Sequence, residues 1–153
     1  MNLDEKDKKL LFLLQLDSKR TTKALATELD LSVTAVFERI KKLEKQKIIH
    51  KYVALVDKKL VQKDFIVLCH VKLSRHSKDY ITQFEKEIAR FSEVMECFHV
   101  SGDYDYILKI SVKDIQDYRE FMVTKLTGLQ HIASTHSSFM IKEVKSTTSV
   151  SLE

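Results

Sequence analysis

The stretch that decides the fold is TTKALATELDLSVTAVFERIKKLEKQK, residues 21–47. In its second half, apolar residues recur at intervals of three and four, which places them on one face of an α-helix. These residues are Val33, Val36, Phe37, Ile40 and Leu43. We expect that face to pack inward. The first half has its own apolar side and ends at Asp30 and Leu31, so the stretch predicts two helices joined by a tight turn.

The second predicted helix has a polar face suited to DNA. Ser32 precedes the apolar run, where its hydroxyl can accept a backbone N–H and begin the helix. The polar face starts with small and hydroxyl residues and ends in cations, as expected for a helix in a major groove. The candidate DNA-binding residues are Thr22, Ser32, Thr34, Ala35, Glu38, Arg39, Lys41, Lys42 and Lys45. The alternatives are an ordinary helical hairpin and, for Arg39, an ion pair with an acid inside the domain.

Charge is distributed unevenly along the 153 residues. Residues 1–63 contain 15 Lys and Arg against 9 Asp and Glu, a net charge of +6, whereas the remainder contains 11 against 13, a net charge of −2. A basic N-terminal half suits a phosphate backbone, and a slightly acidic C-terminal half does not. With 44% hydrophobic residues, the chain can form one medium domain or two small ones.

The sequence shows no feature of a membrane or secreted protein. No apolar run approaches the roughly 20 residues that span a bilayer, and the start, MNLDEKDKK, is charged without an apolar signal core. We therefore expect a cytoplasmic protein. Cys69 and Cys97 stand alone without metal-ligand spacing, so we expect buried reduced thiols, no metal and no cofactor.

The N-terminal region predicts a winged helix-turn-helix domain over residues 1–56. LDEKDKKLLFLLQLD, residues 3–17, predicts a first helix capped by Asp4. IIHKYVALV, residues 48–56, is rich in β-branched and aromatic residues and predicts a strand or small hairpin. The polar stretch DKKLVQKD, residues 57–64, is the expected linker.

Residues 65–153 predict a second domain with a βαββαβ order. The expected strands are FIVLCHVKL (65–73), VMECFHV (94–100), YDYILKISV (104–112) and HIASTHSSFMIKEV (131–144), and the expected helices are DYITQFEKEIARF (79–91) and DIQDYREFMVTKL (114–126). The first strand is a continuous apolar run, which indicates a strand covered on both faces or central in its sheet. The fold class is thus α+β, with a ferredoxin-like antiparallel sheet and both helices on one face. We expect a second copy to cover the other face.

In these features the chain resembles the leucine-responsive regulatory protein/asparagine regulator (Lrp/AsnC) family. The matching pieces are LDEKDKKLLFLLQLDSK, LATELDLSVTAVFERIKKLE, ECFHVSGDYDYILKISVKDIQDY and the closing strand with EVK. The resemblance implies a DNA-binding domain, an amino-acid-sensing domain, and homodimers that assemble into an octamer. The chain has Asp30 and Lys47 where the family usually has Gly, and Leu129, Gln130 and His131 where it usually has Leu-Pro-Gly; these departures leave the fold intact.

The turn at residues 101–105 is the candidate effector loop. Gly102 allows backbone N–H groups to approach a carboxylate, and Asp103 or Asp105 can pair with an α-ammonium. The resemblance implies that the loop lies at a contact between dimers and receives residues of the last strand from a neighbouring subunit. The candidate effector-binding residues are Ser101, Gly102, Asp103, Tyr104, Asp105, Thr135, His136 and Ser137. A plain β-turn is the alternative. Leucine, another apolar amino acid, methionine and lysine all stay open as effectors.

The sequence therefore predicts a sequence-specific transcription regulator that binds double-stranded DNA and whose assembly responds to a free amino acid. One alternative is an architectural protein that compacts DNA without an effector. A second is a decarboxylase related to this family, which would use histidines over the sheet. The histidines in question are His70, His99, His131 and His136. We expect these to be structural and the protein not to be an enzyme, because we find no phosphate-binding glycine loop and no nucleophile with a partner base.

Overall fold

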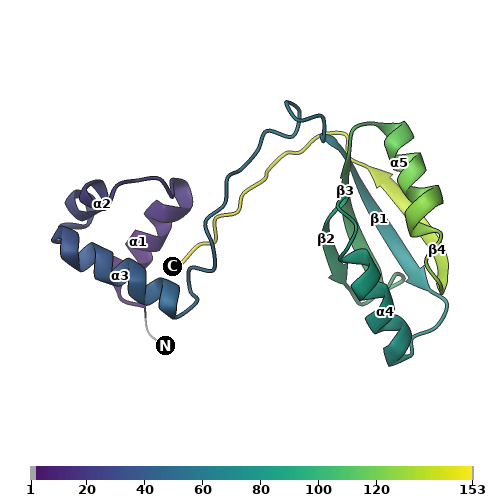
Figure 1. The fold of residues 1–153 in the computed structure, drawn as a ribbon, viewed down its shortest axis with the longest axis horizontal. Helices are drawn as coiled ribbons and strands as arrows, with labels where there is room; N and C mark the ends of the chain where they lie inside the picture. Colours follow the sequence, from purple (N-terminus) through teal and green to yellow (C-terminus); the bar gives the residue numbers. More distant parts are fainter. Residues whose placement is uncertain (1–2, 153) are drawn as a thin grey trace. The chain divides into compact units, whose positions relative to one another are not determined.

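The computed structural model describes residues 3–152 and divides into two compact units (Figure 1). The first unit comprises Met1–Leu55 together with Val144–Glu153, and the second comprises Val56–Glu143. The sequence led us to expect residues 65–153 as one domain, whereas the structure groups the last ten of these with the N-terminal unit. No helix in the described part of the chain is both long enough and apolar enough to cross a membrane.

The first unit contains the three expected helices, α1 (Glu5–Leu16), α2 (Thr22–Leu29) and α3 (Val33–Lys45). Asp4 caps α1 by accepting the N–H of Asp7 at 2.7 Å, and Ser32 caps α3 by accepting the N–H of Ala35 at 3.1 Å. The buried core of the unit consists of Leu10, Leu11, Leu13, Leu25, Ala26, Leu29, Val36 and Leu43. These residues come from all three helices, so the helices form one core.

Two helices of the unit end at residues in the left-handed conformation. At the end of α2, Asp30 is the left-handed residue, with φ 52°, and the N–H of the next residue, Leu31, bonds to the carbonyl of Ala26 at 3.0 Å. The N–H of Ile48 bonds to the carbonyl of Leu43 at 2.9 Å, around Lys47 with φ 57°. Both patterns are Schellman motifs, in which Gly is the usual left-handed residue. The backbone thus keeps the expected turns despite the missing glycines.

The strand expected over residues 48–56 does not form. The structure has neither helix nor strand from residue 50 to residue 56, and Val53, Leu55 and Val56 are exposed. A strand requires a neighbour for its backbone hydrogen bonds, and no other described segment pairs with this one. Side chains still hold the segment in place: Ile48 and Ile49 pack against the three-helix core, and the Tyr52 hydroxyl donates to Glu44 Oε1 at 3.0 Å.

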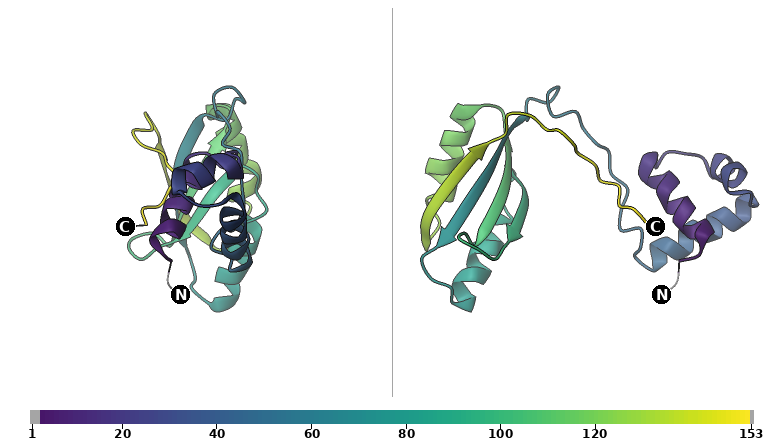
Figure 2. Two further views of the ribbon diagram at one scale, coloured as in Figure 1. Left: turned by 90° about the vertical axis from the view of Figure 1, so that its left-hand side faces the viewer. Right: turned by 180° about the vertical axis from the view of Figure 1, so that it is seen from behind.

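The second unit confirms the βαββαβ order. Its elements are β1 (Phe65–Leu73), α4 (Lys78–Ile88), β2 (Val94–His99), β3 (Tyr106–Val112), α5 (Ile115–Phe121), the π-helical turn η1 (Met122–Leu126) and β4 (Ile132–Phe139). The strands are antiparallel in the order β2-β3-β1-β4, so the apolar strand β1 is central as expected. Both α4 and α5 lie on one face of the sheet (Figure 2).

The core of this unit lies between the helices and one face of the sheet. Val67, Cys69 and Val71 of β1 are fully buried there, and their cross-strand partners on β3 are Ile110, Leu108 and Tyr106. Alternate residues of β1 point to the other face, where Leu68 is 39% exposed. Within residues 3–152 neither helix of the unit covers this face, although Ile66 near its edge is buried.

Candidate DNA interface and ligand site

The polar face of α3 is exposed, as a DNA-reading helix requires. Of the predicted DNA-binding residues, Ser32, Thr34, Glu38, Lys41, Lys42 and Lys45 are exposed, and Thr22, Ala35 and Arg39 are partly buried. Ser32 Oγ already caps the helix, so its hydroxyl serves the backbone. Small residues at the start of α3 and lysines at its end form a surface able to approach base edges and phosphates.

Arg39 is paired inside the domain. Its Nη1 lies 2.6 Å from Asp7 Oδ1 and 2.7 Å from Asp4 Oδ2, which joins α3 to the first turn of α1. Hydrogen bonds to Asp4 and Asp7 raise the pKa of Arg39 above its ordinary value. The ion-pair alternative for Arg39 therefore describes this structure. On the same helix face, Lys42 Nζ lies 3.9 Å from Asp7 Oδ2, whereas Lys41 and Lys45 have no ion-pair partner within residues 3–152.

The apolar face of α3 is narrower than the sequence predicts. Val36 and Leu43 are buried, but Val33 is 49% exposed and Phe37 is 46% exposed. The expectation that Val33 and Phe37 pack inward was wrong, because the small three-helix core covers only the side of the apolar stripe that carries Val36, Ile40 and Leu43. Lys41 Nζ lies 4.4 Å from the centre of the Phe37 ring, a cation–π contact. Exposed apolar side chains on this helix can contact thymine methyl groups.

Hydrogen bonds to neighbouring backbone hold the loop at residues 101–105 in place. The N–H of Val100 bonds to the carbonyl of Asp105, and the N–H of Asp105 bonds to the carbonyl of Val71, both at 2.9 Å. Gly102 has φ 143°, which side chains with a Cβ rarely adopt. A Cβ at this position would meet no atom within 4 Å, so the space beside Gly102 is open. A ligand carboxylate can therefore approach the loop backbone there.

The two aspartates of the loop have different surroundings. Asp105 Oδ2 accepts the N–H of Leu73 at 2.7 Å, and Asp105 Oδ1 lies 2.9 Å from His76 Nε2. Burial acts to raise the pKa of Asp105, but the Leu73 N–H and His76 outweigh it and lower that pKa. Asp103 is exposed, and within residues 3–152 its carboxylate has no hydrogen-bond or ion-pair partner. Asp103 is thus the carboxylate available to a ligand.

The predicted β4 residues point to different faces of the sheet. Thr135 and Ser137 pair in register with Val71 and Cys69, whose side chains lie in the core on the helix face. The hydroxyls of Ser137 and Tyr118 form a hydrogen bond. Since side chains alternate along a strand, His136 points to the open face. Only one of the three therefore lies on the open face of its own chain.

Three rings gather on the open face. The Tyr104 ring centre is 5.2 Å from that of His70 and 6.3 Å from that of His136, and His70 and His136 are cross-strand partners. His70 was not among the predicted ligand residues, because its pairing with His136 depends on strand register, which spacing in the sequence does not reveal.

The other two histidines lie elsewhere. The His99 ring stacks on Tyr106, with ring centres 4.6 Å apart, and the His131 ring packs on Tyr80, with ring centres 3.7 Å apart. The four histidines therefore do not form one cluster. Within the described residues, no three His, Cys, Asp or Glu side chains are grouped so as to hold a metal ion.

Comparison with known proteins agrees with both units. Residues 66–150 match the family described as the Lrp/AsnC ligand binding domain, and residues 3–50 match the family described as winged helix-turn-helix DNA-binding. The leucine-responsive regulatory protein of Haemophilus influenzae is 37% identical over 145 residues, which covers 95% of this chain and 87% of that protein. The Bkd operon transcriptional regulator of Pseudomonas aeruginosa is 34% identical over 142 residues, 93% of each chain.

A solved structure resembles the whole chain. The crystal structure of a transcriptional regulator from Neisseria meningitidis in complex with L-methionine has a TM-score of 0.93 and 30% identity, and covers 97% of this chain and 96% of that one. A helix-turn-helix unit followed by a small-molecule-binding α+β unit defines a DNA-binding transcription regulator. The chain belongs to the Lrp/AsnC family of such regulators.

Proposed function

We propose that this regulator places α3 of each subunit of a dimer in successive major grooves and that an amino acid bound to the second unit changes its assembly and DNA affinity. The observation that carries this proposal is the exposed face of α3, with exposed lysines at its end and small residues at its start. Each lysine that contacts a phosphate contributes affinity, and the small residues permit close approach to bases. Such a protein acts on DNA in the cytoplasm.

The proposed effector is a free amino acid bound at the Gly102–Asp105 loop. Gly102 leaves space for the ligand carboxylate at the backbone, and Asp103, which has no partner within residues 3–152, would accept hydrogen bonds from the α-ammonium. Asp105 is the second choice, because Leu73 and His76 already engage both of its oxygens. Ser101 and Tyr104 complete the loop side, and the β4 residues would come from a neighbouring subunit.

The identity of the amino acid is a separate part of the proposal. Methionine is favoured by its presence in the Neisseria meningitidis complex, and leucine by the name of the Haemophilus influenzae relative. Another apolar amino acid and lysine belong in the same panel. The open face above the loop carries Leu68 and the His70, Tyr104 and His136 rings, which suits an apolar side chain better than a charged one.

Homodimers that assemble into an octamer are also part of the proposal. Exposed apolar side chains lie along the segment after α3, at Val53, Leu55, Val56, Leu60 and Val61. A second apolar surface is the open face of the sheet, where Leu68 is partly exposed. Groups of exposed apolar side chains indicate contact with another chain, and a closed, symmetric assembly of identical subunits would cover both surfaces.

The test is calorimetry of the native protein against a panel of amino acids, after bound ligand has been removed by unfolding and refolding. We expect one amino acid to bind and Asp103→Ala to weaken that binding at least tenfold. Asp64→Ala is the matched control, because Asp64 is an exposed aspartate of the same unit outside the loop. Light scattering should show that the amino acid changes the assembly. If no amino acid binds the native protein, an architectural DNA-compacting protein becomes the better interpretation.

A further inference from the structure

The end of the chain pairs with the first helix of the DNA-binding unit. The N–H of Val150 donates to Gln15 Oε1 at 2.8 Å, and Gln15 Nε2 donates to the carbonyl of Val150 at 3.2 Å. One side-chain amide therefore satisfies both backbone groups of one residue, as a neighbouring strand would. Two residues further on, Leu152 packs against the core of the three helices. These contacts fix the segment on α1.

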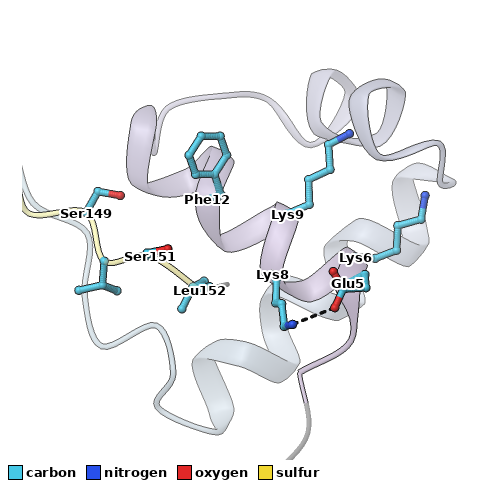
Figure 3. Close-up of a pocket in the computed structure, with 9 residues that line it drawn as sticks. Glu5, Lys6, Lys8, Lys9, Phe12, Ser149, Ser151 and Leu152 are labelled. Atoms are coloured by element: carbon cyan, nitrogen blue, oxygen red, sulfur yellow. Dashed lines mark hydrogen bonds and ion pairs between the residues drawn. The ribbon is translucent and has the colours of Figure 1, made fainter.

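A groove of about 680 Å³ lies between this segment and α1. Figure 3 shows Lys8, Lys9 and Phe12 of α1 on one side and Ser151 and Leu152 of the segment on the other. Phe12 is 52% exposed and adds an apolar surface beside Leu152. The α1 surface thus offers a hydrogen-bonding side chain and apolar contacts to an extended segment.

The same segment begins in the second unit, directly after β4. β4 carries Thr135 and His136 and ends at Phe139, where the N–H of Met140 still bonds to the carbonyl of Ile66 at 3.0 Å. Glu143 Oε1 then lies 3.7 Å from Lys58 Nζ, which ties the start of the segment to the linker. The chain therefore connects the two units twice, once through the linker and once from β4 to α1.

We propose that α1 is the docking surface for the C-terminal segment and that this second connection transmits the ligand state of β4 to the DNA-binding unit. The transmission rests on the proposed function, because it requires a ligand at β4. A ligand that favours one arrangement of β4 changes how well Val150 and Leu152 can remain docked, and docking in turn biases the DNA-binding unit. No contact between the ligand and α1 is needed.

Docking is tested by a double-mutant cycle on the first unit. Gln15→Ala and a chain that ends at Lys145 should each lower its melting temperature by about 4 °C or more. The two changes together should lower the melting temperature no further than truncation alone, because each change removes the same Gln15–Val150 interaction. Ala favours helix more than Gln does, so lost helix propensity cannot explain the decrease. Gln116→Ala, at an exposed helical position of the second unit, is the control. Unchanged or fully additive melting temperatures would overturn the docking.

Transmission is tested by DNA affinity with and without the best-binding amino acid. In the native protein the two affinities should differ about fivefold or more. In Gln15→Ala and in the truncated chain this ratio should approach one, while calorimetry shows unchanged amino-acid affinity. A lowered melting temperature with an unchanged ratio would overturn the transmission. If the native protein binds no amino acid, the proposed function fails and transmission with it, while the melting cycle still decides the docking.

Discussion

Arg39 Nη1 of α3 lies 2.6 Å from Asp7 Oδ1 of α1, and the two side chains form an ion pair in which Asp7 is only 2% exposed. Asp4, which caps α1, contacts the same guanidinium nitrogen at 2.7 Å. The DNA-reading helix is therefore oriented by the two acids at the start of the first helix. Arg39, a predicted DNA-binding residue, thus joins two helices of its own unit.

Removal of this arginine should destabilise the first unit. Arg39→Ala leaves the buried Asp7 carboxylate without its guanidinium, and we expect the free energy of unfolding to fall by about 3 kcal/mol. That is the low end for buried pairs, because the Arg39 side chain is 27% exposed. Urea unfolding gives the value, and Lys42→Ala should change it by less than about 1 kcal/mol. Full stability combined with relaxed base specificity would instead mean that Arg39 reads DNA.

The exposed lysines at the end of α3 should contribute salt-dependent affinity. Lys45→Ala is expected to reduce the slope of log K against log salt by about one, because one phosphate contact is lost. Lys41→Ala should do the same and also uncover the Phe37 ring. Affinities at several salt concentrations give the slopes. Lys86 is an exposed lysine on α4, so Lys86→Ala serves as the control and should leave the slope unchanged. If Lys41→Ala and Lys45→Ala also leave the slope unchanged, the phosphate contacts lie elsewhere.

Lys47 occupies a position where glycine is less strained. With φ 57°, its Cβ crowds the backbone, so Lys47→Gly should stabilise the first unit by about 1 kcal/mol. His131→Gly makes an informative comparison, since His131 also has positive φ but packs its ring on Tyr80. There the relief of strain and the lost ring contact should nearly cancel. Thermal unfolding distinguishes the two, and a lower melting temperature for Lys47→Gly would mean that the lysine makes a stabilising contact.

Asp105 should make the second unit sensitive to acid. Because its pKa is below the ordinary value of 3.8 in the folded state, the unfolded chain binds more protons as pH falls, and stability decreases. This contribution is complete above about pH 5 and is lost as pH falls through the folded pKa. Asp105→Asn should therefore reduce stability at pH 6, and its difference from the native protein should shrink as pH falls below the ordinary pKa of 3.8. Urea unfolding across this range gives the difference, with Asp64→Asn as the control, which should follow the native curve.

Local rules predicted the elements of both units well. The caps at Asp4 and Ser32, the central strand β1 and the turn at Gly102 depend on residues close in sequence, and all appear in the structure. Apolar periodicity also identified the correct face of α3. It could not give the width of that face, because Val33 and Phe37 are exposed or buried according to how much core the other two helices supply.

The candidate sites depended more on contacts between distant residues. The partners of Arg39 are 32 and 35 residues away in the sequence, and the Gln15 contact with Val150 spans 135 residues. Residues 48–56 have the composition of a strand but no partner strand in the described chain, so propensity alone did not produce one. Strand register likewise separates His136 from Thr135 and Ser137, although the three are adjacent in the sequence.

The central place of β1 sets the order in which the protein can form during synthesis. β1 is the first strand to leave the ribosome, yet both of its neighbours, β3 and β4, follow later in the chain. The three helices of the first unit contact one another locally and can fold early, whereas an apolar strand with two unpaired edges must wait for residue 139. A nascent chain thus acquires its DNA-reading helices well before its sheet is complete, and any assembly through that sheet must follow release of nearly the whole chain.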